Sequence, residues 1–286
     1  GEDVKFVGME KEYYRSISDR IKEEVLEEYS DTIEQASIDE FYVELSGESF
    51  EDAEKTAEKI QSEVREQFDL TCSIGIGPNK LVAKIASDRE KPEGLTVVLP
   101  SEVDEFMNSL ELKDIHGIGQ NTIDDLTSMN ITTVEDLRNA EPAALAEHFG
   151  EIFGLKLIEK AKGEDNSAVE ERMQKQITRI VTLKQDSRSP KIIAERFEEI
   201  ANDIMERVEK KDVRFGQVAL IAVDAEIQMH TRSTSLKSRV ADREIVVKKG
   251  RELLEEFIDG FDGEVRRIGL KVGDLEKKKD QTSSTD

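Results

Sequence analysis

The sequence predicts an α+β protein of several domains: an α/β domain, a small all-helical domain and a C-terminal βαββαβ domain. A chain of 286 residues is longer than one ordinary hydrophobic core supports. Helix and strand periodicities alternate over residues 1–100, only the helical period appears over 101–163, and alternation returns from 177. The charge also shifts, because residues 1–170 carry a net −24 and residues 171–286 a net +1.

The N-terminal domain, residues 1–100, is predicted to alternate helices and strands. Apolar residues three or four apart predict helices over 11–29 and 51–67, and residues 33–46 between them predict a hairpin with an acidic tip. The remaining predicted elements are the strand Leu70–Ile76, the helix Lys80–Asp88 and the strand Leu95–Leu99. This order is typical of a sheet packed against helices.

Short helices punctuated by glycine are predicted for residues 101–163, and residues 164–176, which lack aromatics, predict a linker.

The third domain, residues 177–273, is predicted to contain strand Ile177–Leu183, helix Pro190–Glu209, strands Gln217–Ala225 and Ile227–Ser235, helix 242–258 and strand Val265–Val272. The polar residues 274–286 predict a disordered tail.

Composition excludes several classes of protein. No apolar run approaches the roughly 18 residues of a membrane span, and no basic-then-apolar leader is present, so we expect a cytoplasmic protein without a membrane partner. The single cysteine, Cys72, excludes an intrachain disulfide, and one Cys with three His makes a zinc site improbable.

The net charge of −23 has two explanations. It is either an ordinary solvated surface, which an acidic mesophilic protein would share, or an adaptation to molar salt. We favour the halophilic explanation. At about 1 M salt the Debye length is only about 3 Å, so the acidic surface would repel a nucleic acid very little at a distance.

A pair of adjacent carboxylates, Asp39 and Glu40, lies at the tip of the predicted hairpin. Neighbouring side chains on a regular strand point to opposite faces, so both reach one site only where the backbone turns. Such a pair suits Mg²⁺, and two metals about 3.5–4 Å apart can hold the attacking and leaving oxygens of a phosphoryl transfer. The alternative is an acidic turn that binds nothing.

A phosphate-binding surface is predicted where the strand ending at Ile76 opens a helix that carries Lys80 and Lys84. Lys91 follows on a turn stiffened by Pro92. A helix N-terminus with lysines nearby favours phosphate, although the spacing is not that of a P-loop. The alternative is an ordinary turn with surface lysines.

Leu112–Gln120 predicts a helix-hairpin-helix turn, in which Gly117 and Gly119 let the backbone approach a nucleic-acid phosphate without reading sequence. The alternative is a plain turn between helices.

The C-terminal domain offers a second set of candidate DNA contacts on or just after its predicted strands. They are Arg232, Lys237, Arg239, Arg266 and Arg267. The alternative is a sheet face of mixed charge.

Taken in this order, the motifs resemble those of the Y-family translesion DNA polymerases, the DNA polymerase IV group with its archaeal members. ASIDE at 36–40 resembles the second catalytic motif, and SIGIGPNKLVAKIASDREKPEG at 73–94 resembles the third palm motif. IHGIG at 115–119 resembles the thumb hairpin, and the segments 177–190 and 265–269 resemble the first and last strands of the little-finger domain.

The resemblance implies a palm, a helical thumb and a little finger. Asp39 and Glu40 would hold two Mg²⁺ ions, Lys91 with Lys84 would contact the triphosphate of a dNTP, and the hairpin glycines would contact a primer phosphate. Arg232, Arg266 and Arg267 would hold primer-template DNA. The implied reaction is error-prone, template-directed DNA synthesis across damaged DNA, with attack of the primer 3′-OH on the α-phosphorus.

The family pattern begins with a strand that carries a further metal-binding Asp, followed by a fingers domain, and Gly1 aligns after both. We therefore expect a truncated palm, and a chain that by itself does not polymerise. One alternative is a non-catalytic DNA-binding module, and another is an interaction protein with an acidic face. A sliding-clamp partner is implied, although the tail lacks the Gln-plus-aromatic clamp-binding pattern.

Overall fold

The computed structural model describes residues 8–171 and 174–278, and the chain divides into two compact units, residues 1–172 and 173–286. Within the described ranges, none of the helices has the length and apolar character needed to cross a bilayer. Each unit has its own hydrophobic core, as the sequence predicts for separate domains.

The first part of the N-terminal unit alternates helices and strands. Its elements are α1 (Lys11–Glu24), β1 (Ile33–Gln35), β2 (Phe41–Val43), α2 (Phe50–Phe68), β3 (Ile74–Ile76), α3 (Lys80–Arg89) and β4 (Leu95–Val97). The hairpin β1–β2 is antiparallel, whereas β3 and β4 are parallel and are joined through α3. Among the described residues these strands form two separate two-stranded sheets.

A small core joins the hairpin to the helices around it. Val25 and Leu26 after α1, Ile33 of β1, and Ile60 and Val64 of α2 pack together. The strand predicted to begin at residue 70 begins later because α2 runs to residue 68 and the chain then turns through a left-handed residue 69, with φ +52°.

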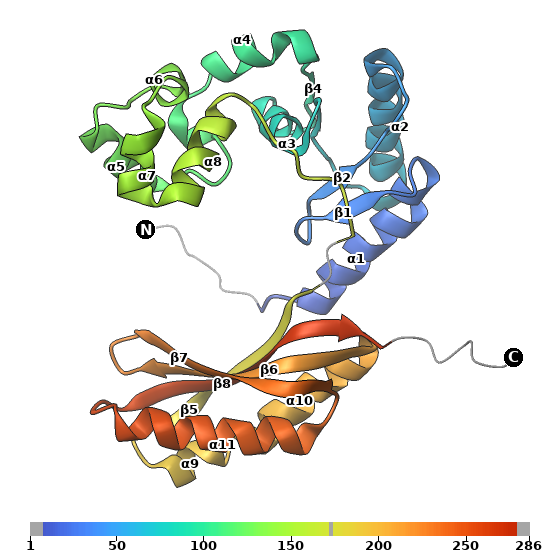
Figure 1. Ribbon diagram of the computed structural model, residues 1–286. Coiled ribbons are helices and arrows are strands. Elements are labelled where there is room, and N and C mark those ends of the chain that lie inside the picture. The colour runs from blue at the N-terminus through green and yellow to red at the C-terminus, as the bar shows by residue number, and fades with distance from the viewer. Residues whose placement is uncertain (1–7, 172–173, 279–286) are drawn as a thin grey trace, which may run out of the picture. The chain divides into compact units, whose positions relative to one another are not determined.

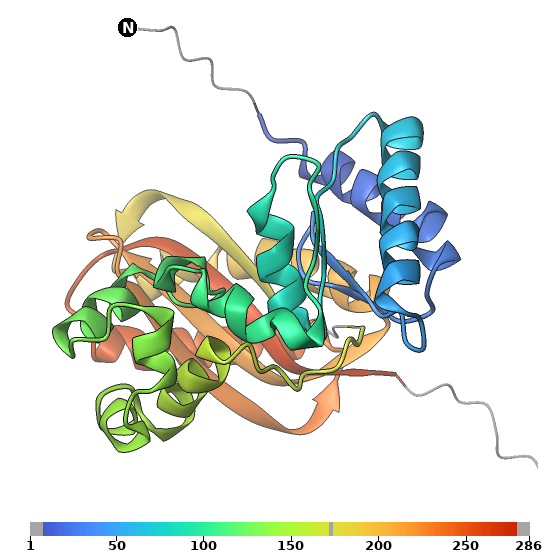
Figure 2. The same cartoon turned by 90° about the horizontal axis from the view of Figure 1, so that it is seen from above.

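Short helices follow and form the second part of the N-terminal unit: α4 (Val103–Asn108), α5 (Gln120–Ser128), α6 (Val134–Arg138), α7 (Pro142–Phe149) and α8 (Glu151–Ala161). Both views show α5 to α8 gathered into one bundle (Figures 1 and 2). A Cβ on Gly154 would lie 2.7 Å from the backbone of Leu145, so glycine allows α8 to pack directly on α7.

The segment after α8 docks on the same unit. Asn79 donates from Nδ2 to the carbonyl of Gly163 at 2.7 Å, and Lys80 donates from Nζ to the carbonyl of Ala168 at 2.7 Å. Glu170 donates its backbone N–H to a carboxylate oxygen of Glu34 at 3.3 Å. The first part of the predicted linker is therefore held against β1 and α3.

The C-terminal unit is a four-stranded antiparallel sheet with helices on one face (Figure 1). The strand order within the sheet is β5-β8-β6-β7. The order of elements along the chain confirms the predicted βαββαβ pattern, with the first helix divided in two. The bounds are β5 (Gln176–Ser187), α9 (Pro190–Ala194), α10 (Phe197–Lys210), β6 (Val213–Asp224), β7 (Met229–Val240), α11 (Arg243–Asp259) and β8 (Val265–Lys277).

Several boundaries of the C-terminal unit differ from the prediction, because β5 continues to Ser187, β6 begins at Val213 and β7 ends at Val240. The predicted helix 190–209 is divided into α9 and α10, because Arg196 donates to the carbonyl of Ile193, three residues back, and tightens the turn. The last strand continues to Lys277, which lies opposite Val213 of β6, so the predicted tail begins later than residue 274. Residues 279–286 of that tail lie outside the described residues.

The helix α9 offers a matched pair for testing the core. Ile193 is fully buried and Ile192, its neighbour, is 51% exposed. We expect Ile193→Ala to lower the free energy of unfolding of the C-terminal unit by about 2–4 kcal/mol, and Ile192→Ala to change it by under about 0.5 kcal/mol. Urea unfolding followed by circular dichroism measures both. Equal losses would contradict the packing described.

Candidate active site

The turn of the hairpin β1–β2 carries both predicted carboxylates. The backbone N–H groups of Ala36 and Ser37 donate to the carbonyl of Glu40 at 2.9 and 3.3 Å, which closes the turn. Asp39 lies exposed on it, and the hydroxyl of Ser37 donates to the Asp39 carboxylate. The backbone thus turns at Asp39 and Glu40, as the sequence predicts.

The helix α3 lies beside the hairpin and carries two of the predicted lysines. A Cβ on Gly75 would lie 2.1 Å from the carbonyl oxygen of Ala83, so only glycine in β3 allows α3 to pack this closely. Lys80 and Lys84 are four residues apart and share one helix face. Lys80 pairs with Glu34 and Lys84 pairs with Glu40, each at 2.6 Å.

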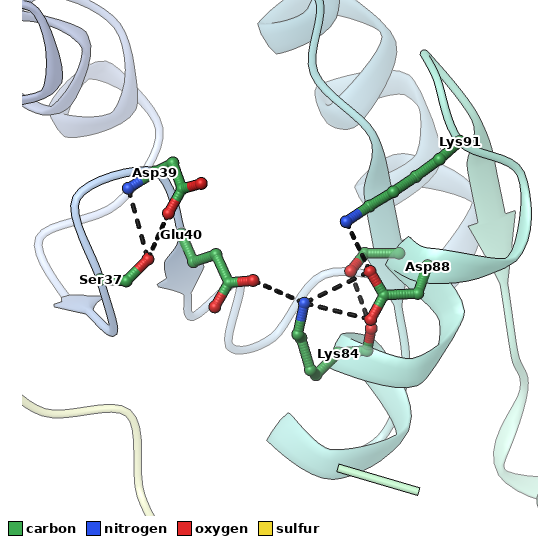
Figure 3. Close-up of polar contacts among 7 residues, drawn as sticks. Ser37, Asp39, Glu40, Lys84, Asp88 and Lys91 are labelled. Carbon is green, nitrogen blue, oxygen red and sulfur yellow. Dashed lines mark hydrogen bonds and ion pairs between the residues drawn. The ribbon is translucent and has the colours of Figure 1, made fainter. Parts of the chain in front are cut away.

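A chain of alternating charges extends from Glu40 (Figure 3). Lys84 lies 3.1 Å from Asp88, and Asp88 lies 2.6 Å from Lys91, so the two ammonium groups approach one carboxylate from two sides. The sequence analysis did not single out Asp88. Its position, four residues after Lys84 and three before Lys91, is the signal that could have identified it.

The charges of this chain stabilise one another. Burial alone would lower the pKa of Lys84, but hydrogen bonds to Glu40 and Asp88 outweigh it and raise the pKa. Burial alone would raise the pKa of Asp88, but hydrogen bonds from Lys91 and Lys84 outweigh it and lower the pKa. Lys84 and Asp88 are therefore both charged near neutral pH.

The donor set of the turn suits a hard divalent cation. Asp39 and Glu40 offer only carboxylate oxygens, which Mg²⁺ prefers, and Asp39 is accessible to solvent. Within residues 8–171 and 174–278, no group of three or more His, Cys, Asp or Glu side chains is arranged to hold a metal. The described part of the chain thus supplies two carboxylates to this position.

The predicted helix-hairpin-helix turn lies between a 3₁₀ turn, Leu112–Asp114, and α5. Gly117 has φ +85°, which favours glycine, and Gly119 precedes the first residue of α5 without a side-chain cap. A Cβ on Gly119 would meet nothing within 4 Å, so the constraint on glycine is at Gly117. Lys160 of α8, which the sequence analysis missed, donates to the carbonyl of His116 at 2.6 Å.

The five predicted cations of the C-terminal unit lie on two strands, three of them on β7 and two on β8. Arg239 is paired with Asp274 at 2.7 Å and Arg266 with Asp186 at 2.9 Å. Arg232 lies over the ring of Phe257 of α11, with its guanidinium carbon 6.0 Å from the ring centroid. The other two, Lys237 on β7 and Arg267 on β8, are exposed.

Three family models match separate parts of the chain. The model described as the impB/mucB/samB family matches residues 2–88, and that described as the impB/mucB/samB family C-terminal domain matches residues 174–285. A third, described as DNA polymerase-iota, thumb domain, matches residues 113–165.

Curated proteins match over nearly the whole chain. DNA polymerase IV 1 of Methanosarcina mazei is 38% identical over 290 residues, which cover 98% of this chain and 79% of that protein. DNA polymerase IV of Nitrosopumilus maritimus is 34% identical over 99% of this chain and 79% of its own length.

Solved structures agree with these matches. A Y-family DNA polymerase chimera, Dbh-Dpo4(243-245)-Dbh, has a TM-score of 0.88 at 29% identity, covering 95% of this chain and 79% of that one. An insertion ternary complex of Dbh DNA polymerase has a TM-score of 0.70 at 28% identity, covering 96% and 79%.

The fold, the turn with its two carboxylates and the matches to known proteins together define this protein as a DNA-directed DNA polymerase. Within that class the chain belongs to the Y family, the family of DNA polymerase IV. The α/β part of the N-terminal unit is the palm domain, the helices α5 to α8 form the thumb, and the C-terminal sheet is the little finger.

The buried pair between Glu34 and Lys80 generates a stability prediction. Glu34 is 1% exposed, so Lys80→Met removes a cation from beside a buried carboxylate and should lower the free energy of unfolding of the N-terminal unit by about 3 kcal/mol. Adding Glu34→Gln should recover part of the loss in urea unfolding. Lys55→Met, which breaks an exposed pair with Glu51, should cost under about 1 kcal/mol. Additive losses in the double variant would contradict the pairing.

Asp88 generates a pH prediction. Because its folded-state pKa is lowered, its contribution to stability is present above its unfolded pKa and is lost as pH falls through the folded pKa. We expect the carboxyl-carbon NMR titration of Asp88 to have its midpoint below the usual value of about 3.9, and Lys91→Met to raise that midpoint. A midpoint indifferent to Lys91 would rule out the bridging role.

Proposed function

We propose that this chain carries the palm, thumb and little finger of a polymerase that synthesises DNA across damaged template. The observation that supports this most is the position of Glu40, which pairs with Lys84 and through it with Asp88 and Lys91. This arrangement occurs in a chain that belongs to the Y family. The reaction is attack of a primer 3′-OH on the α-phosphorus of a dNTP, with release of pyrophosphate.

Asp39 and Glu40 would hold the Mg²⁺ ions, which neutralise developing charge on the transferred phosphoryl group when bound. Ser37 orients Asp39 through its hydroxyl. Lys84 and Lys91 would bind the phosphate oxygens of the triphosphate, with each ammonium exchanging a carboxylate for a phosphate. Lys84 lies 2.6 Å from Glu40 and 3.1 Å from Asp88, so binding a phosphate would require it to give up one of these carboxylates.

Primer-template DNA would be held by the thumb turn at Gly117 and Gly119 and by the cations of the little finger. Among the described residues no carboxylate forms an ion pair with Lys237 or Arg267, so these two are ready to contact phosphates. Arg239 and Arg266 must first leave Asp274 and Asp186, and Arg232 must leave the ring of Phe257.

We also propose that the 286 residues alone bind DNA without extending a primer. Two-metal transfer needs more oxygen ligands than the two carboxylates that the described residues bring to the turn. The acidic composition leads us to propose a cytoplasm of high salt as the working environment. A sliding-clamp partner stays a prediction.

A binding titration tests the proposal. We expect the chain to bind labelled primer-template in fluorescence anisotropy with an affinity that falls as KCl rises. Arg267→Ala should reduce the slope of log K against log salt by about 0.9, and Arg239→Ala, already paired with Asp274, should reduce it less. Circular dichroism in the same buffers shows whether KCl stabilises the fold, as salt adaptation requires.

Primer extension with Mg²⁺ is the second readout of this experiment. Template-directed extension would overturn the proposed inactivity of the isolated chain. Salt-independent affinity, or none, would overturn DNA binding and favour the interaction-protein alternative.

A further inference from the structure

The glycine turn of the thumb has two possible orientations of its central peptide. The N–H of Ile118 donates to the carbonyl of Ile115 at 3.0 Å, and Gly117 at the third position has φ +85°, which together define a type II turn. Type I and type II turns share their end positions and differ mainly by rotation of the peptide between the two central residues. Here that is the peptide between His116 and Gly117.

The ends of this turn are fixed, whereas its central peptide is exposed. Ile115 and Ile118 are buried in the thumb core, while His116 lies at the surface. Core packing therefore sets where the turn begins and ends. It leaves open which way the central carbonyl points.

Lys160 of α8 contacts this central peptide. Its Nζ donates to the carbonyl oxygen of His116 at 2.6 Å, and a Cβ on Gly117 would lie 2.5 Å from the same nitrogen. Burial lowers the pKa of Lys160, consistent with an ammonium group partly removed from water. Within the described residues, Lys160 forms no ion pair with a carboxylate, so its hydrogen bond to the carbonyl is not in competition with one.

The planarity of the peptide bond transmits this contact to the adjacent donor. In a trans peptide the C=O and the following N–H point in opposite directions in one plane. Fixing the carbonyl of His116 toward Lys160 therefore directs the N–H of Gly117 away from Lys160. In a type I turn the same N–H would point the other way.

We propose that Lys160 is a positioning residue for DNA binding: it holds the turn in the type II form, so that the Gly117 N–H faces a backbone phosphate. The inference rests on the proposed function, because it assumes that the thumb turn meets DNA. The ammonium acts through the peptide, and the phosphate is contacted by a neutral backbone donor.

The test is anisotropy of labelled primer-template with the full chain over a KCl series. We expect Lys160→Met to lower affinity about three- to tenfold at every salt concentration, the value of one hydrogen bond, with the log–log slope unchanged. Lys160→Arg, which can still donate to the carbonyl, should return affinity to within about twofold of the unsubstituted chain. Lys156→Met removes an exposed charge one turn earlier on α8, and should change affinity less than about twofold.

Each contrary result has a distinct meaning. A slope shallower by about 0.9 in Lys160→Met would show that Lys160 itself contacts a phosphate, and would overturn the positioning role. Unchanged affinity would show that the turn keeps its orientation without the lysine, which also overturns it. If the unsubstituted chain does not bind DNA, the proposed function fails instead. Thermal unfolding confirms that each variant folds, and Lys160→Gln replaces Lys160→Met should the latter not fold.

Discussion

The ion pair between Glu34 and Lys80 joins three segments on which the palm site depends. Glu34 belongs to the hairpin that carries Asp39 and Glu40, the proposed catalytic carboxylates, and Lys80 begins the helix that carries Lys84. The same two side chains also hold the segment after α8, through Ala168 and Glu170. Burying both charges is costly, and the several hydrogen bonds between them and the backbone offset that cost.

Because residues four apart on α3 share one face, the ion pair of Lys80 also determines the position of Lys84. Once Lys80 is fixed against Glu34, Lys84 lies one turn further along the same face and meets Glu40. Asp88 is the next residue on this face and forms ion pairs with both Lys84 and Lys91. Lys84 and Lys91, which we propose bind phosphate, are thus each paired with a carboxylate, so binding of a nucleotide would exchange one ion pair for another.

Local pattern was enough to predict most of the fold, because each element buries its own periodic apolar face. It predicted the hairpin with Asp39 and Glu40 at a turn, the helix from Lys80, and the βαββαβ order. It did not predict the break at Arg196, since Ile193 and Phe197 on either side keep helical spacing and both enter the core. The hydrogen bonds that join Glu34, Asn79 and Lys80 to residues 163–170 connect positions far apart in the chain, which no local period predicts.

The acidity of the chain affects which DNA contacts can be effective. Contacts made by lysine or arginine weaken steeply with salt, by a slope of about 0.9 for each phosphate neutralised. A backbone N–H carries no net charge, so its hydrogen bond to phosphate weakens far less. In molar salt a thumb that presents an oriented Gly117 N–H would therefore keep a larger share of the total affinity than the cations of the little finger. Lys160, which is partly buried, donates to the carbonyl of His116 and not to a phosphate, so in the proposed role its charge adds nothing to the salt dependence of DNA binding.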